Sequence, residues 1–591
     1  MTTDKTIFES ALLPIVLGVT GHRDLQPNDV KGLEASVGKI ISDLKIKYPN
    51  SPFVLLSPLA EGADRLVARV ALTNNVELIV PMPLPQEEYE KDFAEVSSLE
   101  EFRAFLTKAR KCFTVGNNAQ NDKLVSGIQR EQGYFGVGRY IVENCQILIA
   151  LWDGVNVGKK GGTSDIVHLQ LVGGHDNACA EGDLTQEDID NIFNPVQTGV
   201  VYHVMARRIG TDTVTAPDSR FLGRRAVANT LPCSVNVLYP LSLSNVADDT
   251  VFARMLNCQE TMNSVIIEKS NQIKENIKQS SDWLIPEKNR HLLPESLKKQ
   301  IEIFSLWDAL ACFYQNKNHF NLITMASIIP FLALSIEIYK SYDNNIVFVV
   351  LYLALLFIAF AQYVINSRSK SLIKYIDSRA LAEGLRVNLF WRIAGIKESA
   401  SDYYINRQRS ETEWIRYAIR NYDLLGTGYT EVDRNTAYKI LLDYWIAGQS
   451  GYFKSASVRD RNKYELLSKR ANMLINFAMF VINPIVIISH YTKFAGDNVD
   501  NAMMVALAVT FVAAAAIGYY SDRMMFNDNF KQYIITGSLF SKVESYLTTQ
   551  CEKSLNDNVR EVLFQLGKEA LDESGDWIQM HRDRALEVPK L

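Results

Sequence analysis

Four stretches of the chain are long, apolar and almost free of charge, and they constrain the fold more than any other feature of the 591 residues. A helix of about 20 residues spans the ~30 Å hydrocarbon core of a bilayer, and each stretch has about that length. Buried core helices are the alternative, but they are usually shorter and keep a polar stripe. We therefore expect four transmembrane helices, at residues 320–338, 346–365, 471–489 and 502–520.

The four windows form two hairpins with short polar turns, separated by residues 367–470. Glu337 lies near the end of the first window, where a carboxylate is tolerated at the membrane interface. Basic residues cluster after the second window and before the third, and such clusters mark the cytoplasmic side. We therefore expect a multi-pass protein of the inner (cytoplasmic) membrane with both termini in the cytoplasm. The basic residues are Arg368, Lys370, Lys374 and Arg379, then Arg459, Arg461, Lys463, Lys469 and Arg470.

The leading window of each hairpin contains one proline, Pro330 and Pro484. The pair indicates either an old duplication or matched kinks, and prolines are common in membrane helices. The flanks of the windows have helical patterns, at 307–315, 378–391 and 522–584. We expect these helices to pack against one another or against other subunits. Four spans in one chain cannot enclose a wide pore, so we expect a homo-oligomer.

Composition excludes several classes of protein. The chain has 62 Lys and Arg against 67 Asp and Glu, a formal net charge of -5, so nothing supports a nucleic-acid partner. The seven cysteines are scattered without C-x-x-C or a Cys/His cluster, which favours reduced thiols over disulfides or a metal site. The first apolar run is strand-like and no signal peptide is recognisable, so we expect the N-terminal domain in the cytosol.

Residues 1–250 alternate strand-like and helix-like runs, which predicts an α/β domain with a parallel sheet. The strand candidates are 15–19, 53–57, 76–81, 147–152 and 200–204. In such sheets ligands bind beyond the carboxyl ends of the strands. We therefore expect a ligand site where these strands end.

Three strand ends carry residues suited to an anionic ligand. After the first, Gly21 permits a close turn, and Arg23 can form a forked contact with phosphate, or alternatively a surface ion pair. His22 is a ligand contact or a turn cap. After the second, Glu61, Gly62 and Asp64 form a turn leading into a helix, and Asp64 is a ligand residue or a helix cap.

The third strand end gives the sharpest signal. Trp152 and Asp153 are followed by a short basic loop and then by Gly161, Gly162, Thr163, Ser164 and Asp165 at the start of a helix. Glycines at a helix start let backbone N–H groups approach an anion, and the two hydroxyls add donors. This predicts a phosphate cradle rather than an ordinary tight turn. The Gly-Lys-Ser/Thr order of a Walker P-loop is absent.

These motifs resemble the SLOG superfamily, a Rossmann-like fold found in LOG phosphoribohydrolases, DprA-type proteins and the ligand-binding region of melastatin-type TRP channels. The resemblance covers residues 10–245. The membrane half resembles a SLATT-type effector module, on the motifs at 307–311, 379–386 and 567–577. Proteins with this pairing are bacterial membrane effectors of antiviral conflict systems. The resemblance thus implies a nucleotide second messenger, of ADP-ribose type, NAD-derived or cyclic, that triggers membrane permeabilisation.

Ile166 argues against an enzyme. The LOG motif has a glutamate three positions after its threonine, and here that position is Ile166, which can exchange no protons. Asp165 is adjacent, but neighbouring helical residues point about 100° apart. The histidines and cysteines form no other catalytic signature. We therefore expect no catalytic residue and no cofactor beyond the sensed nucleotide.

The favoured hypothesis is a nucleotide-gated membrane effector, a channel or a membrane-disrupting assembly. A membrane-anchored nucleotide hydrolase of LOG type and a constitutive transporter or scaffold are the alternatives. Base-reading contacts are expected in the loops 115–138 and 173–194, where Tyr134 either stacks on a base or belongs to the core. The expected divisions are 1–250 (nucleotide sensor), 251–318 (helical linker), 319–366 (first hairpin), 367–470 (cytosolic helices), 471–521 (second hairpin) and 522–591 (C-terminal helices).

Overall fold

The computed structural model forms two compact units. It describes residues 8–116, 127–156, 161–173, 198–210, 231–240, 248–341, 345–404, 412–426, 431–492, 496–549 and 554–583. The first unit comprises Met1–Lys269 and Arg407–Thr427, and the second comprises Ser270–Asn406 and Gly428–Leu591. The first unit is therefore longer than the predicted domain at 1–250, and it includes a segment from between the two apolar hairpins.

A seven-stranded sheet forms the centre of the first unit, in the order β4-β3-β2-β1-β5-β6-β7. All neighbouring pairs are parallel except β6 with β7. The strand order reverses between β1 and β5, which is where doubly wound sheets bind their ligands. The strands are β1 Ile15–Gly21, β2 Phe53–Leu56, β3 Glu77–Met82, β4 Lys111–Thr114, β5 Ile147–Trp152, β6 Val200–Met205 and β7 Val235–Leu238.

This Rossmann-like sheet confirms the predicted fold class and all five predicted strands. β4 and β7 were not predicted, because each is only four residues long and lies at an edge of the sheet with partly exposed side chains. The central strands β1, β2 and β5 are apolar and buried on both faces, which is why their sequences read as continuous apolar runs.

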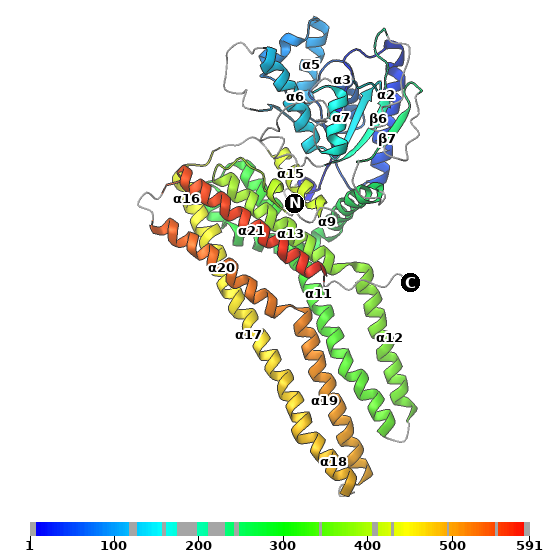
Figure 1. The fold of residues 1–591 in the computed structure, drawn as a ribbon, viewed down its shortest axis with the longest axis vertical. Coiled ribbons are helices and arrows are strands. Elements are labelled where there is room, and N and C mark those ends of the chain that lie inside the picture. Colours follow the sequence, from blue (N-terminus) through cyan, green and yellow to red (C-terminus); the bar gives the residue numbers. More distant parts are fainter. Residues whose placement is uncertain are drawn as a thin grey trace, which may run out of the picture. The chain divides into compact units, whose positions relative to one another are not determined.

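Helices cover both faces of the sheet (Figure 1). Helix α2 packs against α3, and helix α6 packs against α7. Helix α2 shows why: its apolar residues recur at three- and four-residue intervals and are buried, from Leu33 to Leu44. These helices are α2 Val30–Lys47, α3 Ala63–Thr73, α6 Gly127–Asn144 and α7 Thr163–Val172, with the peripheral α4 Gln86–Tyr89, α5 Val96–Lys108, η1 Pro27–Asp29 and η2 Glu90–Asp92.

Two further helices hold the amino ends of the strands. In α9, Asp248–Leu284, the Gln259 amide donates to the carbonyls of Leu13 (2.9 Å) and Pro14 (2.8 Å), just before β1. In α15, Glu413–Leu425, the Asn421 amide donates to the same Pro14 carbonyl at 2.9 Å. Leu424 of α15 belongs to the core cluster beneath α6 and α7. These contacts are the physical reason why the first unit extends past residue 250.

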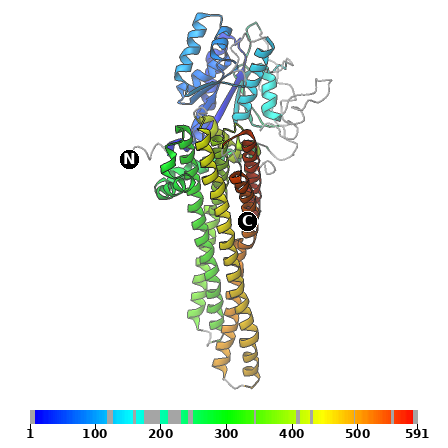
Figure 2. The same cartoon turned by 90° about the vertical axis from the view of Figure 1, so that its left-hand side faces the viewer.

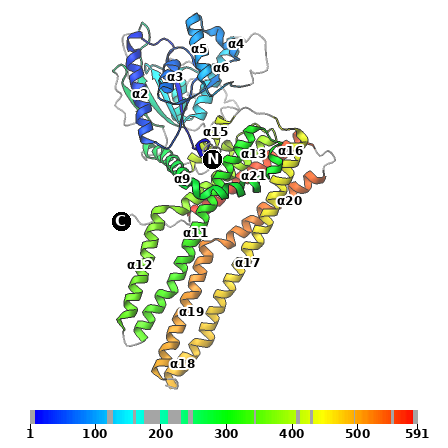
Figure 3. The same ribbon diagram turned by 180° about the vertical axis from the view of Figure 1, so that it is seen from behind.

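In the described part of the second unit, four helices are long and apolar enough to cross a membrane (Figure 3). They contain the four predicted windows, and almost all their apolar side chains lie at the surface of the chain; in the window of α12 none is buried. Such a surface fits a lipid bilayer. The helices are α11 Glu295–Ser341, α12 Ile346–Ser369, α17 Ala447–Phe477 continued by η6 Ala478–Ile482 and α18 Asn483–Thr492, and α19 Asp497–Arg523.

The apolar helices continue into a helical body, as the flanking patterns predict (Figure 2). A break in a left-handed conformation separates α12 from α13 at Lys370 (φ 47°), and a similar break at Met525 (φ 54°) separates α19 from α20. Such a conformation costs a non-glycine residue about 1 kcal/mol or more, so each break is held by its surroundings. The body comprises α13 Ser371–Ile393, α20 Phe526–Thr549 and α21 Asp557–Asp583, with the short α10 Glu287–Arg290, α14 Ala400–Tyr403, α16 Arg434–Ile440 and η5 Leu441–Ile446.

The two prolines occupy different surroundings. Pro330 lies inside α11, which continues through it. Pro484 lies two residues after the end of the π-helical segment η6, where the widened turn accommodates the missing N–H. The two hairpins nevertheless share a plan, because in each the second apolar helix ends at a left-handed residue.

Candidate ligand site at the strand ends

The three predicted strand ends meet at the carboxyl edge of the sheet. The His22 N–H donates to the Leu151 carbonyl at the end of β5, and the Ala63 N–H donates to the His22 carbonyl, each at 3.0 Å. His22 therefore links all three exits through its backbone. Its position between β1 and β5 places it at the point where the strand order reverses.

Two glycines make this approach possible. A Cβ on Gly21 would lie 2.4 Å from Cβ of Ala63, and a Cβ on Gly62 would lie 2.3 Å from the Arg23 carbonyl oxygen. Gly62 also has φ 78°, which other residues rarely adopt. Both glycines were predicted as site residues, and their direct role is to let the β1 and β2 exits touch.

The His22 ring completes the link to β5. Its Nε2 lies 3.1 Å from both the backbone nitrogen and Oδ1 of Asp153. Burial acts to raise the pKa of Asp153, but hydrogen bonds from His22 and from the Val155 N–H outweigh it, and the net pKa is lowered. Asp153 is thus an ionised carboxylate that orients the His22 ring.

Arg23 is the exposed cation of the site. Its guanidinium carbon lies 5.0 Å from the centre of the Tyr134 ring, in a cation–π contact. Among the described residues, Arg23 forms no ion pair with a carboxylate. The alternative of a surface ion pair therefore finds no support in the described part of the chain. The guanidinium also forms a side-chain hydrogen bond with Tyr134, and its exposed part can contact an anion.

The loop after β2 is held by its own side chains. The Asp64 carboxylate accepts the Ala60 N–H at 3.2 Å, and Glu61 accepts the Ser98 hydroxyl. Gly62, not Asp64, is the N-cap of α3, so the helix-cap interpretation of Asp64 is wrong. Burial raises the pKa of Asp64 to about 7, against the lowering effects of Arg23, the Ala60 N–H and Arg65. Leu59 in this loop adopts φ 60°, a strained conformation of the kind that clusters at functional sites.

The turn before α7 is closed by a hydrogen bond within it. The Gly161 N–H donates to Oδ2 of Asp165 at 2.8 Å, so Asp165 closes the turn from within. Gly162 is the N-cap, with Thr163 and Ser164 as the first helical residues, and the buried Ser164 hydroxyl donates to Asn156 at 3.2 Å. The turn thus presents the start of a helix, but Asp165 already uses one of its N–H groups. The basic residues Lys159 and Lys160 lie outside the described residues.

Two predicted positions are buried in the core. Trp152 is 1% exposed and its indole N–H donates to the Val155 carbonyl at 3.0 Å, so its side chain offers no surface to a ligand. Ile166 is 3% exposed and packs against Gly138 of α6, where a Cβ would lie 2.5 Å from the Ile166 side chain. A carboxylate at position 166 would be buried in this apolar cluster.

The residues that the strand pattern missed come from α6 and from the segment after β3. Tyr134 lies inside α6 rather than in the predicted loop at 115–138. Its hydroxyl contacts the Asp92 carboxylate, which also pairs with Arg130, and its ring meets the edge of Tyr89 with centroids 6.1 Å apart. Burial, with help from Asp92, raises the pKa of Tyr134 to about 12. No sequence motif signals Asp92, because only the packing of α6 against the β3 exit brings it here. The second loop expected to read the base, 173–194, lies almost wholly outside the described residues.

The fold and this edge define a class: a Rossmann-like α/β unit in one chain with four helices able to cross a membrane. Compared with known families and curated proteins, the sequence matches no family model and no curated protein. The resemblance of the motifs to SLOG and SLATT modules therefore remains a hypothesis.

Proposed function

We propose that this chain is a nucleotide-gated membrane effector. An anionic nucleotide binds at the carboxyl edge of the sheet, with Arg23 as the phosphate contact and the Tyr134 ring beside it. Binding changes the packing of the helices that lead to the apolar spans, and an oligomer of these spans then permeabilises the membrane. Because the motifs of the chain resemble SLOG and SLATT modules, the proposal includes a role in bacterial antiphage defence.

The observation that carries the proposal is the exposed Arg23 at the topological switch point of a doubly wound sheet. It is held by an aromatic ring and has no described carboxylate partner. Isolated arginines at such edges suit phosphate oxygens, because the guanidinium forks onto two of them. Helix α7 also begins at this edge, and the dipole at its N-terminus favours negative charge.

A route from this edge to the spans is supported by the opposite end of β1. Residues of α9 and α15 bind the carbonyl of Pro14, directly before β1, while His22 and Arg23 follow its other end. The chain passes between the two units within α9 and on both sides of α15. A ligand that shifts the β1 exit therefore acts on a strand whose other end is bonded to both connecting helices. The ligand can shift the equilibrium between two packings of the helices only by the difference between its binding free energies for them.

The hydrolase alternative has less support. The position at which LOG enzymes carry glutamate is filled by buried Ile166. The adjacent Asp165 is committed to the Gly161 N–H. A sensor needs neither group to act on the ligand.

Dye release from liposomes tests the proposal. The full chain is reconstituted in both orientations and exposed to NAD, ADP-ribose and cyclic nucleotides, with direct binding and turnover measured in parallel. Release that requires one nucleotide, and that is lost in Arg23→Ala and in Gly162→Glu, is the expected result. Gly162 has φ -75°, so glutamate fits its backbone and simply adds negative charge at the turn.

Arg110→Ala is the matched control. Arg110 is an exposed arginine directly before β4, at the amino edge of the sheet, where it pairs with Glu77. It should retain gated release. Release without nucleotide, unchanged by Gly162→Glu, would instead establish a constitutive transporter. Turnover abolished by Asp165→Asn would establish the hydrolase, and failure of every nucleotide to bind would refute sensing.

A further inference from the structure

A cavity of about 530 Å³ lies inside the helical body of the second unit. Helices α9, α11, α13, α17, α20 and α21 all contribute to its lining. Its volume falls in the range of small-molecule sites, about 300–1,000 Å³. It belongs entirely to the second unit and is separate from the strand-end site of the first.

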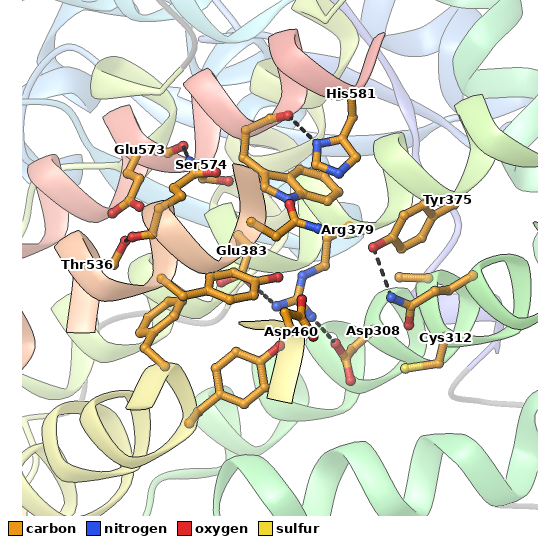
Figure 4. A pocket seen from close by; sticks show the side chains of 18 of the residues that line it. Asp308, Cys312, Tyr375, Arg379, Glu383, Asp460, Thr536, Glu573, Ser574 and His581 are labelled. Carbon is orange, nitrogen blue, oxygen red and sulfur yellow. Dashed lines mark hydrogen bonds and ion pairs between the residues drawn. The ribbon is translucent and has the colours of Figure 1, made fainter. Parts of the chain in front are cut away.

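Most of the charges in the cavity neutralise one another. Arg379 of α13 pairs with Asp308 of α11 at 3.2 Å and with Glu383 at 2.5 Å (Figure 4). Arg386 also pairs with Glu383, at 2.6 Å, and Arg459 pairs with Asp460 at 3.0 Å. An anionic ligand at Arg379 or Arg386 would have to displace these carboxylates, which is costly because the two arginine side chains are only 25% and 3% exposed.

Glu573 of α21 is different, because no described cation forms an ion pair with it. The nearby Thr536 hydroxyl is its side-chain hydrogen-bond donor, but that single proton is also directed to the Gln532 carbonyl at 3.0 Å. Burial raises the pKa of Glu573 to about 7, and the neighbouring Asp576 and Glu569 add to the rise. Figure 4 shows Glu573 beside Thr536 at the cavity. The cavity therefore holds one carboxyl group that lacks a countercharge.

An aromatic wall adjoins this carboxyl. Tyr533 and Phe540 flank Thr536 on one face of α20, three and four residues away. Phe453 of α17 lies 5.8 Å from the Tyr533 ring and 5.9 Å from the Phe540 ring, and Tyr452 and Trp445 extend the wall at 6.4 and 6.5 Å. Aromatic faces carry negative potential and attract cations.

We propose that this cavity binds a small organic cation, an amine or a quaternary ammonium group, with Glu573 as the counter-ion and the aromatic wall as the packing surface. An ammonium group satisfies both features at once: it neutralises the carboxyl and lies against the rings. The arginine ion pairs remain intact.

The site adjoins the apolar spans. Its lining includes His319, directly before the first window, and Arg523, just after the fourth. His319 and Tyr520 are hydrogen-bonded at 2.6 Å, so the two helices touch at this level. A bound cation thus contacts helices that continue into the spans, and it biases their packing independently of any nucleotide at the sheet.

Calorimetric titration of the full chain in detergent tests the site. The probes are tetramethylammonium and spermidine, with acetate as an anionic comparison. Saturable binding of an ammonium probe is expected, weakened by about tenfold or more in Glu573→Gln, because a charge-assisted contact is lost. Glu561→Gln is the matched control: Glu561 lies earlier on the same helix α21, is exposed, is not part of the lining and does not act on the pKa of Glu573. It should bind as the parent does.

A second variant keeps the proposal testable if Glu573→Gln unfolds. Phe453→Leu keeps an apolar side chain but removes an aromatic face, and it should weaken tetramethylammonium binding. The proposal fails if neither ammonium probe binds, if both variants bind as the parent does, or if acetate binds in their place. Because Arg23 takes no part, Arg23→Ala should leave ammonium binding unchanged, which separates this site from the proposed nucleotide site.

Discussion

At the scale of single residues, close packing and charge explain the strand-end site. Gly21 and Gly62 are there because a Cβ would collide with neighbouring loops. Arg23 is exposed and lies on a ring, whereas nearby Asp64 is 6% exposed and uses its carboxylate to hold its own loop. Arginine and aspartate therefore differ in accessibility, and of the two only Arg23 is exposed to solvent.

Asp64 should make nucleotide affinity depend on pH. Its pKa is raised to about 7, and an anion at Arg23 raises it further, so binding takes up a proton. We expect affinity to fall as pH rises through about 7, by at most about tenfold per pH unit. Titrations with a nucleotide whose phosphates stay fully ionised measure this dependence.

Asp64→Asn keeps an acceptor for the Ala60 N–H and should flatten the profile. An unchanged slope in this variant would assign the proton to another group. The same raised pKa has a consequence for stability. A carboxyl protonated more readily in the folded state stabilises the fold at low pH, and this contribution is lost as pH rises from about 4 to about 7.

At the scale of elements, α15 shows how far a segment travels to complete a core. It follows the first hairpin in sequence, yet it packs in the first unit. Its Tyr422 hydroxyl donates to the Ala11 carbonyl at 2.5 Å, and Lys111 of β4 donates to the Gly426 carbonyl at 2.6 Å. The helix is strongly amphipathic, so its buried face needs a partner that its sequence neighbours do not supply.

Leu424→Ala should therefore destabilise the first unit. Leu424 is 2% exposed in the cluster under α6 and α7, and truncating a buried leucine costs about 2–5 kcal/mol. The loss of stability is measured by thermal unfolding of the full chain, with limited proteolysis within residues 8–116 as the readout for the first unit. Leu425→Ala, at the partly buried neighbour, should cost clearly less. Equal effects would mean that α15 is not part of this core.

At the scale of the whole molecule, one edge of the sheet carries the proposed ligand site and the opposite edge carries the contacts to α9 and α15. The carboxyl ends of β1 and β5 carry His22 and Asp153, whereas the amino end of β1 is bonded to α9 and α15. The two strands are parallel and paired along their length, so we expect a displacement at one edge to reach the other.

Asn421→Leu should separate binding from gating. It removes the α15 contact to the Pro14 carbonyl, which still accepts Gln259 at 2.8 Å, so the strand end remains hydrogen-bonded. Nucleotide affinity should stay within about threefold of the parent, while nucleotide-dependent dye release falls. Parallel binding and release assays on the same preparation measure both. Loss of binding together with release would mean that α15 only supports the fold.

The sequence alone determined the elements whose signals are local. Four apolar windows are dictated by length and hydropathy, and five strands by apolar runs between turn residues, because each requires only neighbouring residues. The sequence also predicts that Gly21, His22 and Gly62 lie close together, because parallel strands end at the same edge of a sheet. Tertiary structure alone decided the rest. Tyr134 meets Arg23, Trp152 and Ile166 enter the core, and α15 joins the first unit only when distant segments pack. Such contacts depend on the complementarity of surfaces far apart in the chain, and no local pattern encodes that.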